Sequence, residues 1–267
     1  MKIGISNLAW LKRDNLKIIN NLKKKKISFL EYSYHKLINF HPELKVQEIR
    51  KFYIMNKISL YSMQSLFFKS KNCYIFGSQI QRNNFITELK KKICIAKKLK
   101  TKILVFGSPK NKKNISLLTK EEMFKIFKDE FSKLSGFCKN KGVCICIEAN
   151  PKFYKTDFLI YTKDALDMVK KIDSPNIKLN FDLGTVISNR EKYKTLLKEN
   201  VKFIGHIQVS LPKLKKITCK NKKIADFFRF LKKIKYKEAI SIEQIHSKKN
   251  NIKNVTKAIN FISNLSK

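Results

Sequence analysis

The sequence predicts a single α/β domain, residues 1–267, that folds as a closed (β/α)₈ TIM barrel. Three observations predict this fold. The chain is 267 residues long, which suits one barrel. Short apolar runs alternate with longer, lysine-rich amphipathic stretches, and the alternation repeats eight times. Strands that alternate with helices indicate parallel βαβ units, and eight such units fit a closed barrel better than an open doubly wound sheet.

The predicted strands are the apolar runs at residues 2–6, 27–32, 58–64, 103–107, 143–148, 177–182, 203–209 and 239–243. The predicted helices lie near residues 12–25, 45–56, 83–99, 118–140, 163–172, 191–199, 222–234 and 253–265. Pro and Gly residues follow several strands, and no glycine-rich phosphate loop of the Rossmann or P-loop type occurs. The longest non-periodic segments, 67–78 and 108–116, follow the third and fourth strands, where the βα loops of a barrel carry the chemistry.

The formal net charge of +39, from 59 basic and 20 acidic residues, is typical of a nucleic-acid binder. Almost all of the basic residues are lysine, however, whereas phosphate and base recognition favours the guanidinium fork of arginine. Lys, Asn and Ile are all abundant, a pattern that AT-rich codon usage produces. We therefore expect a lysine-coated surface that attracts anions nonspecifically, without specific nucleic-acid binding.

The six cysteines include no CxxC pair, which indicates a reducing cytoplasm without disulfides. The apolar run after Met1 is too short for a signal peptide. No stretch approaches the roughly 20 apolar residues of a membrane span. We expect a cytoplasmic protein that does not enter the membrane.

Side-chain parity on the last four strands brings polar residues together, because successive side chains of a strand point to opposite faces. On one face, the four strands end in Glu148, Asp182, Gln208 and Glu243, whereas the opposite face of each strand is largely apolar. In the seventh strand, for example, one face carries His206 and Gln208 and the other carries Phe203, Gly205, Ile207 and Val209. Polar residues at the C-terminal ends of barrel strands are typical of catalytic residues. The structural alternative for any single one is a helix cap or a solvated loop residue.

Three carboxylates in one place repel each other, which raises their pKa values. A divalent cation relieves this repulsion, and carboxylate and amide oxygens are hard ligands suited to Mg²⁺ or Mn²⁺. The sequence therefore predicts a metal site formed by Glu148, Asp182, Gln208 and Glu243. His206 lies one inward step below Gln208 and is either a satisfied core histidine or a substrate contact.

Six passages resemble the xylose isomerase-like barrel superfamily, which includes sugar phosphate isomerases and epimerases, ketose 3-epimerases and hydroxypyruvate isomerases. They are Ile3-Gly4-Ile5-Ser6, Gly107-Ser108-Pro109-Lys110-Asn111, Ile147-Glu148-Ala149-Asn150-Pro151, Phe181-Asp182-Leu183-Gly184, Gly205-His206-Ile207-Gln208-Val209 and Ser241-Ile242-Glu243. The resemblance covers essentially the whole chain and depends on the order and spacing of these passages.

The resemblance implies a sugar or sugar-phosphate isomerase or epimerase that depends on a divalent metal. In the epimerases of this group, Glu, Asp, His and Glu at the last four strand ends bind the metal, and the two glutamates exchange protons with the substrate carbon. Carried over, Glu148 and Glu243 are the catalytic pair. Gln208 replaces the His, as in hydroxypyruvate isomerases, which favours Mg²⁺ or Mn²⁺ over Zn²⁺. Thr185 stands where the epimerases have a substrate-binding His, so the sugar is not defined.

The implied reaction removes a proton next to a carbonyl and returns it to the neighbouring carbon or to the opposite face. The predicted substrate contacts are His206, Gln64, Asn150 and Glu31, together with Lys110, Lys112 or Lys113 for a substrate phosphate.

Two alternatives remain from the sequence. An apurinic-site endonuclease shares the fold and suits the charge, but it requires three zinc ions with many histidine ligands, and this chain has four histidines. The second alternative is a noncatalytic barrel, or a partner subunit within a biosynthetic cluster. Members of such families often dimerise, so the sequence is compatible with a homodimer.

Overall fold

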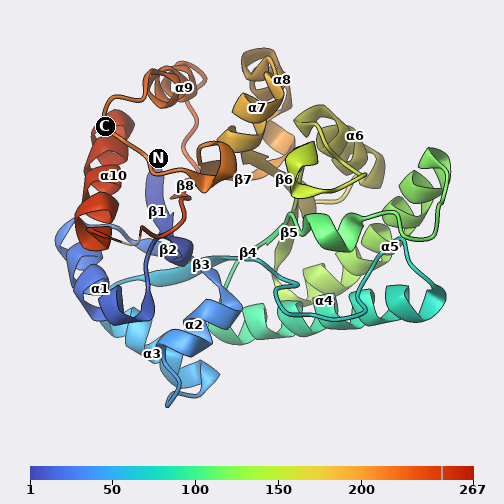
Figure 1. Ribbon diagram of the computed structural model, residues 1–267, viewed down its shortest axis with the longest axis horizontal. Helices are drawn as coiled ribbons and strands as arrows, with labels where there is room; N and C mark the ends of the chain where they lie inside the picture. Colours follow the sequence, from blue (N-terminus) through green and yellow to red (C-terminus); the bar gives the residue numbers. More distant parts are fainter. Residues whose placement is uncertain (248) are drawn as a thin grey trace.

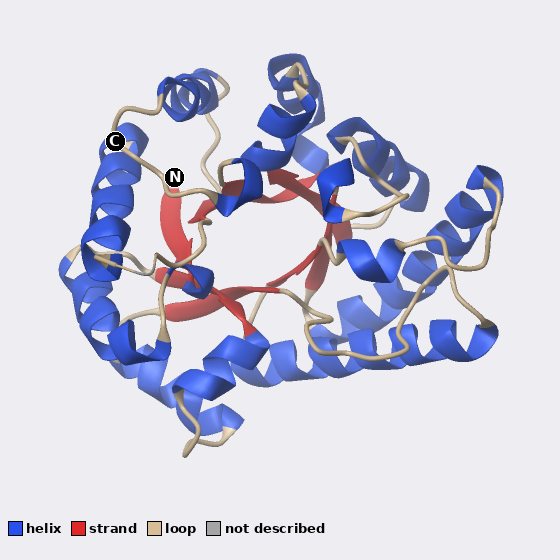
Figure 2. Cartoon of the chain, in the orientation of Figure 1, coloured by secondary structure: helices blue, strands red, loops and turns tan. Residues whose placement is uncertain are grey.

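The computed structural model describes residues 1–247 and 249–267 and contains a closed barrel of parallel strands in the order β1 to β8. The strands are β1 (Lys2–Ser6), β2 (Phe29–Ser33), β3 (Ser59–Gln64), β4 (Ile103–Phe106), β5 (Cys144–Glu148), β6 (Ile177–Asp182), β7 (Ile204–Val209) and β8 (Ala239–Ile242). Viewed down the barrel, the strands form a ring that helices enclose (Figure 2). The predicted (β/α)₈ barrel is confirmed.

The α-helices of the described residues are α1 (Asn15–Lys24), α2 (Tyr34–Phe40), α3 (Val46–Met55), α4 (Gln79–Leu99), α5 (Lys120–Lys141), α6 (Thr162–Ile172), α7 (Leu183–Asn189), α8 (Tyr193–Asn200), α9 (Lys222–Lys233) and α10 (Asn251–Ser266). The sequence does not predict α2 and α7, because seven residues are too few to display a helical period. The last helix, α10, lies beside β1 and brings the two ends of the chain together (Figure 1). Within the described ranges, no helix has the length and apolar character needed to cross a membrane.

The two longest helices begin with capping boxes that are visible in the sequence. Ser78 accepts a hydrogen bond from the backbone N–H of Gln81 at the start of α4, and Thr119 accepts one from Glu122 at the start of α5. Helix α5 ends at Gly142, whose φ of +66° lies in the left-handed region that glycine adopts without strain. These local signals fix the ends of α4 and α5, which pack against each other, and α5 also packs beside β5.

Side chains of the strands divide between two layers, as parity predicts. Ile145 and Ile147 of β5 belong to the main core between strands and helices. Cys146, on the opposite face, forms a separate small cluster with Ile103 and Val105 of β4. The barrel therefore has its own interior packing below the polar strand ends.

The register between β6 and β7 shifts between Leu179 and Asn180, so that Asn180 pairs with His206. An extra residue on one strand turns a side chain to the other face. A Cβ atom at Gly205 would lie 2.6 Å from the Sγ of Cys146, so this glycine faces the barrel interior. The predicted outward position of Gly205 is wrong, because the strand bulges there.

The register between β2 and β3 also shifts, between Leu30 and Glu31, and Glu31 then pairs with Ser62. The shift places Ser62 and Gln64 on the same inward face as Glu31. It thereby assembles polar side chains from two neighbouring strands inside the barrel.

Candidate active site

A cavity of about 560 Å³ opens at the C-terminal ends of the strands. Six of the residues predicted for the site line it: Glu148, Asp182, Glu243, Gln64, Asn150 and Lys110. Aromatic side chains from the loops, among them Phe67, Phe68, Tyr74 and Tyr154, form other parts of its wall. The cavity therefore has a carboxylate floor and partly aromatic sides, a mixture of apolar and polar groups that is typical of small-molecule sites.

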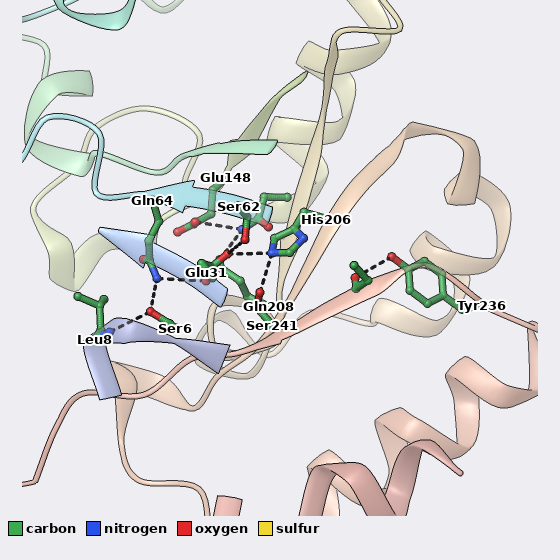
Figure 3. A network of polar contacts seen from close by, with 12 residues as sticks. Ser6, Leu8, Glu31, Ser62, Gln64, Glu148, His206, Gln208, Tyr236 and Ser241 are labelled. Atoms are coloured by element: carbon green, nitrogen blue, oxygen red, sulfur yellow. Dashed lines mark hydrogen bonds and ion pairs between the residues drawn. The ribbon is translucent and has the colours of Figure 1, made fainter. Parts of the chain in front are cut away.

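Three other predicted residues, Gln208, His206 and Glu31, lie beneath the cavity and do not line it. All three side chains are almost completely buried. Figure 3 shows Glu31 at the centre of this layer, with His206 and Gln208 beside it. The predicted residues thus separate into an upper layer that faces the cavity and a lower layer that supports it.

The carboxylate of Glu31 accepts four hydrogen bonds (Figure 3). Its Oε1 accepts from Gln208 Nε2 at 2.9 Å and from Gln64 Nε2 at 3.1 Å. Its Oε2 accepts from Ser62 Oγ at 2.9 Å and lies 2.8 Å from His206 Nε2. Because a carboxylate offers about four acceptor positions, Glu31 is saturated within the protein.

His206 is a fully buried histidine held by its Nε2 atom. This nitrogen lies 2.8 Å from Glu31 Oε2 and 3.1 Å from Ser241 Oγ. In the described part of the chain, its Nδ1 has no hydrogen-bond partner. Complete burial beneath the cavity favours a core position for His206 over direct contact with a substrate, with only one of its two ring nitrogens satisfied.

Asn180 connects the two layers. Its Nδ2 donates to Gln208 Oε1 at 2.5 Å and to Glu148 Oε2 at 3.0 Å. The amide oxygen of Gln208 therefore points toward the Glu148 side, while its nitrogen points toward Glu31. The sequence contains a signal for Asn180, since it shares the inward parity of Asp182.

Asp182 caps helix α7, which starts directly after β6. Its Oδ1 accepts from Ser210 Oγ at 2.5 Å and from Gly184 N at 3.3 Å. Its Oδ2 accepts from the backbone N–H and the hydroxyl of Thr185, both at 2.9 Å. The helix-cap alternative thus applies to Asp182, and the same carboxylate also lines the cavity.

The three cavity carboxylates hold their protons more tightly than exposed ones. Desolvation, and next the negative charge of Asp182, raises the pKa of Glu148 to about 8. The pKa of Glu243 is raised well above its ordinary value by burial, with further contributions from neighbouring carboxylates. Burial also raises the pKa of Asp182, against the effect of its hydrogen bonds. A pKa of about 8, as for Glu148, suits a group that exchanges protons near neutral pH.

Lys112 is a fully buried lysine in contact with the main chain of Glu148. Its Nζ donates to the backbone carbonyl of Glu148 at 2.8 Å and lies 5.6 Å from the ring centre of Phe106. Desolvation lowers its pKa to about 7, and the charge of Glu148 opposes this shift. Its ammonium group is thus committed to the Glu148 main chain, whereas the exposed Lys110 lines the cavity.

Tyr154 is a cavity residue that the sequence does not predict. It ends the short 3₁₀ helix Lys152–Tyr154 after β5, in a loop without periodicity that could mark it. Burial, and then the charges of Glu243, Asp182 and Glu148, raises its pKa. Its hydroxyl group therefore remains a hydrogen-bond donor next to the carboxylates.

The oxygen donors at and below the cavity floor are of the chemical type that binds a hard divalent cation. Glu148, Asp182 and Glu243 offer carboxylate oxygens whose mutual repulsion a cation would relieve, and Gln208 directs an amide oxygen toward Glu148. Over residues 1–247 and 249–267, no three His, Cys, Asp or Glu side chains are grouped closely enough to hold a metal ion as they stand. The residue types suit the ion, but the carboxylate side chains would have to move closer together to bind it.

The fold and the site together define a class of protein. A profile described as the xylose isomerase-like TIM barrel matches residues 21–265, and the chain belongs to this family. A comparison with curated protein sequences gives no match.

Solved structures of several sugar epimerases are similar to the chain. L-ribulose 3-epimerase has 15% sequence identity and a TM-score of 0.83, over 99% of this chain and 94% of the other. D-psicose 3-epimerase from Clostridium cellulolyticum H10, solved with D-tagatose, has 14% identity and a TM-score of 0.80, over 100% of both chains. The IOLI protein, solved with a zinc atom, has 17% identity and a TM-score of 0.78, over 100% and 98%. At these identities the likeness establishes the shared fold.

Proposed function

We propose that the protein is a sugar or sugar-phosphate isomerase or epimerase that works by two-glutamate proton transfer. The observation that carries the proposal is the group of carboxylates at one cavity, Glu148, Asp182 and Glu243, each with a raised pKa. The family and the epimerases of the same fold support it.

Glu148 and Glu243 are the proposed catalytic pair. One takes a proton from the carbon next to the substrate carbonyl, and the other returns a proton to the neighbouring carbon or to the opposite face. A general base works best when its pKa is close to the working pH. The pKa of Glu148 is about 8 in the metal-free protein, and a bound cation would lower it from there. Asn150 and Asn180 each donate to one oxygen of Glu148 and hold its carboxylate in place.

The proposed ligands of a divalent metal are Glu148, Asp182, Gln208 and Glu243. When bound, the ion would polarise the carbonyl and stabilise negative charge that develops on the substrate. The hard oxygen ligands favour Mg²⁺ or Mn²⁺ over Zn²⁺, although the IOLI protein contains zinc.

Gln64, Asn150 and Lys110 are the proposed substrate contacts, because all three line the cavity. The buried Asn150 Oδ1 has no protein partner in the described residues, which leaves it free to accept from a substrate hydroxyl. Lys110 is exposed at the mouth and suits the phosphate of a sugar phosphate. Glu31 and His206, predicted from the sequence as substrate contacts, are better suited to supporting roles.

The test is incorporation of solvent deuterium. EDTA-treated protein, reloaded with Mg²⁺ or Mn²⁺, is incubated in D₂O with a panel of ketoses, ketose phosphates and hydroxypyruvate, and mass spectrometry measures deuterium on carbon. We expect incorporation into at least one compound, lost in E148Q and E243Q and kept in E121Q, which changes an exposed glutamate of α5. No incorporation into any compound, or full incorporation with E148Q, would contradict the proposal.

An apurinic-site endonuclease is the second candidate, because its fold is shared and the net charge is +39. Among the described residues that line the cavity there is no histidine, which disfavours a three-zinc centre. Cleavage of an abasic duplex by the metal-loaded protein would reverse this choice. A noncatalytic barrel, a cytoplasmic location and a homodimer stay predictions from the sequence.

A further inference from the structure

We infer that Glu31 is a positioning residue that holds the side-chain amide of Gln208 with its oxygen toward Glu148. In this way a neutral glutamine that lies beneath the cavity keeps its oxygen available as the fourth of the proposed metal ligands. The inference rests on the proposed metal site, and it assigns to Glu31 a role through Gln208 and not through the substrate.

The direction of the Gln208 amide follows from the chemistry of its two neighbours. A carboxylate accepts hydrogen bonds, so the Gln208 atom at 2.9 Å from Glu31 Oε1 must be the amide nitrogen. The amide oxygen is then at the other end, 2.5 Å from Asn180 Nδ2. A reversed amide would place two oxygens together at Glu31 and two NH₂ groups together at Asn180.

Asn180 carries this orientation to the catalytic carboxylate. Its Nδ2 also donates to Glu148 Oε2 at 3.0 Å, so one NH₂ group serves oxygens of both Gln208 and Glu148. The Gln208 oxygen therefore lies on the same side as the Glu148 carboxylate. An amide oxygen has two lone pairs, and the second stays available for a cation.

Burial makes the arrangement dependent on Glu31. The side chains of Glu31 and Gln208 are 0% and 1% exposed, so water cannot replace a lost partner. Glu31 itself lies beneath the cavity and does not line it, so it is not placed to contact a substrate. Its hydrogen bonds orient the side chains of Gln208 from β7 and Gln64 from β3. Glu31 lies between these two glutamines (Figure 3).

The test is a double-mutant cycle on metal affinity. EDTA-treated wild type, E31M, Q208L and the E31M/Q208L variant are titrated with MnCl₂ by calorimetry. Because partners that orient a ligand change metal affinity by about 10–100-fold, we expect each single change to weaken Mn²⁺ binding by about tenfold or more. The double variant should bind no more weakly than Q208L. Additive losses would overturn the inference, because Glu31 would then act through its charge.

Matched variants separate orientation from charge and from folding. S62A removes a different donor to Glu31 and should keep Mn²⁺ affinity within about twofold of wild type. E31D keeps the charge but withdraws the carboxylate by one methylene, and it replaces E31M in the cycle if that variant does not fold. If E31D binds Mn²⁺ as wild type does, the inference is overturned.

A second measurement needs no metal. In ¹⁵N-labelled protein, the side-chain NH₂ signals of Gln208, identified by their loss in Q208L, should exchange slowly with water in wild type and S62A. They should exchange much faster in E31M or E31D. If wild type binds no Mn²⁺, the proposed metal site fails while the amide signals still decide the role of Glu31. Equal exchange rates in wild type and both Glu31 variants would overturn that role.

Discussion

The Nζ atom of Lys112 donates a hydrogen bond of 2.8 Å to the main-chain carbonyl of Glu148 at the end of β5. Lys112 is fully buried, and the remaining lysines of its loop, Lys110 and Lys113, are exposed. Burial lowers the pKa of Lys112 to about 7, and the negative charge of Glu148 opposes that shift. When its amine is protonated, Lys112 in turn lowers the pKa of the proposed catalytic base.

Lys112→Met should raise the pKa of the Glu148 carboxyl above its value of about 8, because the charge of Lys112 lowers that pKa in the wild-type protein. Carbon-13 NMR titration of the glutamate side-chain carboxyls, with E148Q to identify the signal, measures the change. Lys110→Met and Lys113→Met should leave the pKa almost unchanged. A Glu148 pKa that stays constant or falls in Lys112→Met would contradict this assignment.

In the metal-free protein, the contribution of Glu148 to stability should decrease as pH rises from 5 to 7, whereas the lowered pKa values of His41 and His246 act in the opposite direction below about pH 6.5. The pKa of Glu148 is about 8 in the folded protein and 4.5 as its ordinary value, so the folded state binds more protons in this window. Each such carboxyl lowers the free energy of unfolding by up to about 1.4 kcal/mol per pH unit. The lowered pKa of Lys112 acts in the opposite direction only above about pH 7.

Urea denaturation in EDTA at several pH values measures this effect, and E148Q is the control. The stability of wild type relative to E148Q should fall as pH rises, because only wild type takes up the proton at this position. Parallel stability curves for the two proteins would show that Glu148 titrates normally.

Asn180→Asp should destabilise the protein more than any loss of a single hydrogen bond. The change replaces the NH₂ group between Glu148 and Gln208 with an oxygen, which removes two bonds and adds a carboxylate to the group. We expect a loss of about 3 kcal/mol at pH 7.5, and a smaller loss at pH 5 where the new group is protonated. Thermal and urea unfolding measure it, with the exposed Asn83→Asp as the control. Equal effects at both positions would contradict the bridging role.

Gly205→Ala should destabilise the protein by about 1–3 kcal/mol, because the new methyl group has no space. It would lie 2.6 Å from Cys146 Sγ and 2.7 Å from the Cβ of Lys178. Gly136→Ala is the matched control: nothing lies within 4 Å of its Cβ position in α5, and alanine there should stabilise by about 0.5–1 kcal/mol. If urea unfolding shows Gly205→Ala to be neutral, the inward position of Gly205 is wrong.

Much of the barrel could be predicted from local patterns. The bounds of β1 and β6 agree with the apolar runs, and α9 agrees to within one residue. The short helices α2 and α7 escaped prediction, and the helix-cap alternative for Asp182 could be decided only from its hydrogen bonds with Gly184 and Thr185. Local periodicity requires length, and these elements have too few residues to show it.

The sequence by itself determined that Glu148, Asp182 and Glu243 stand at strand ends, since parity and order along the chain are local properties. Only the tertiary structure decided that Glu31 and His206 lie below the cavity, that Lys112 points to Glu148, and that Tyr154 reaches the mouth. The physical reason is that register shifts, barrel closure and burial arise from contacts between residues far apart in the sequence. The bond between Glu31 and Gln208, 177 positions apart, is such a contact.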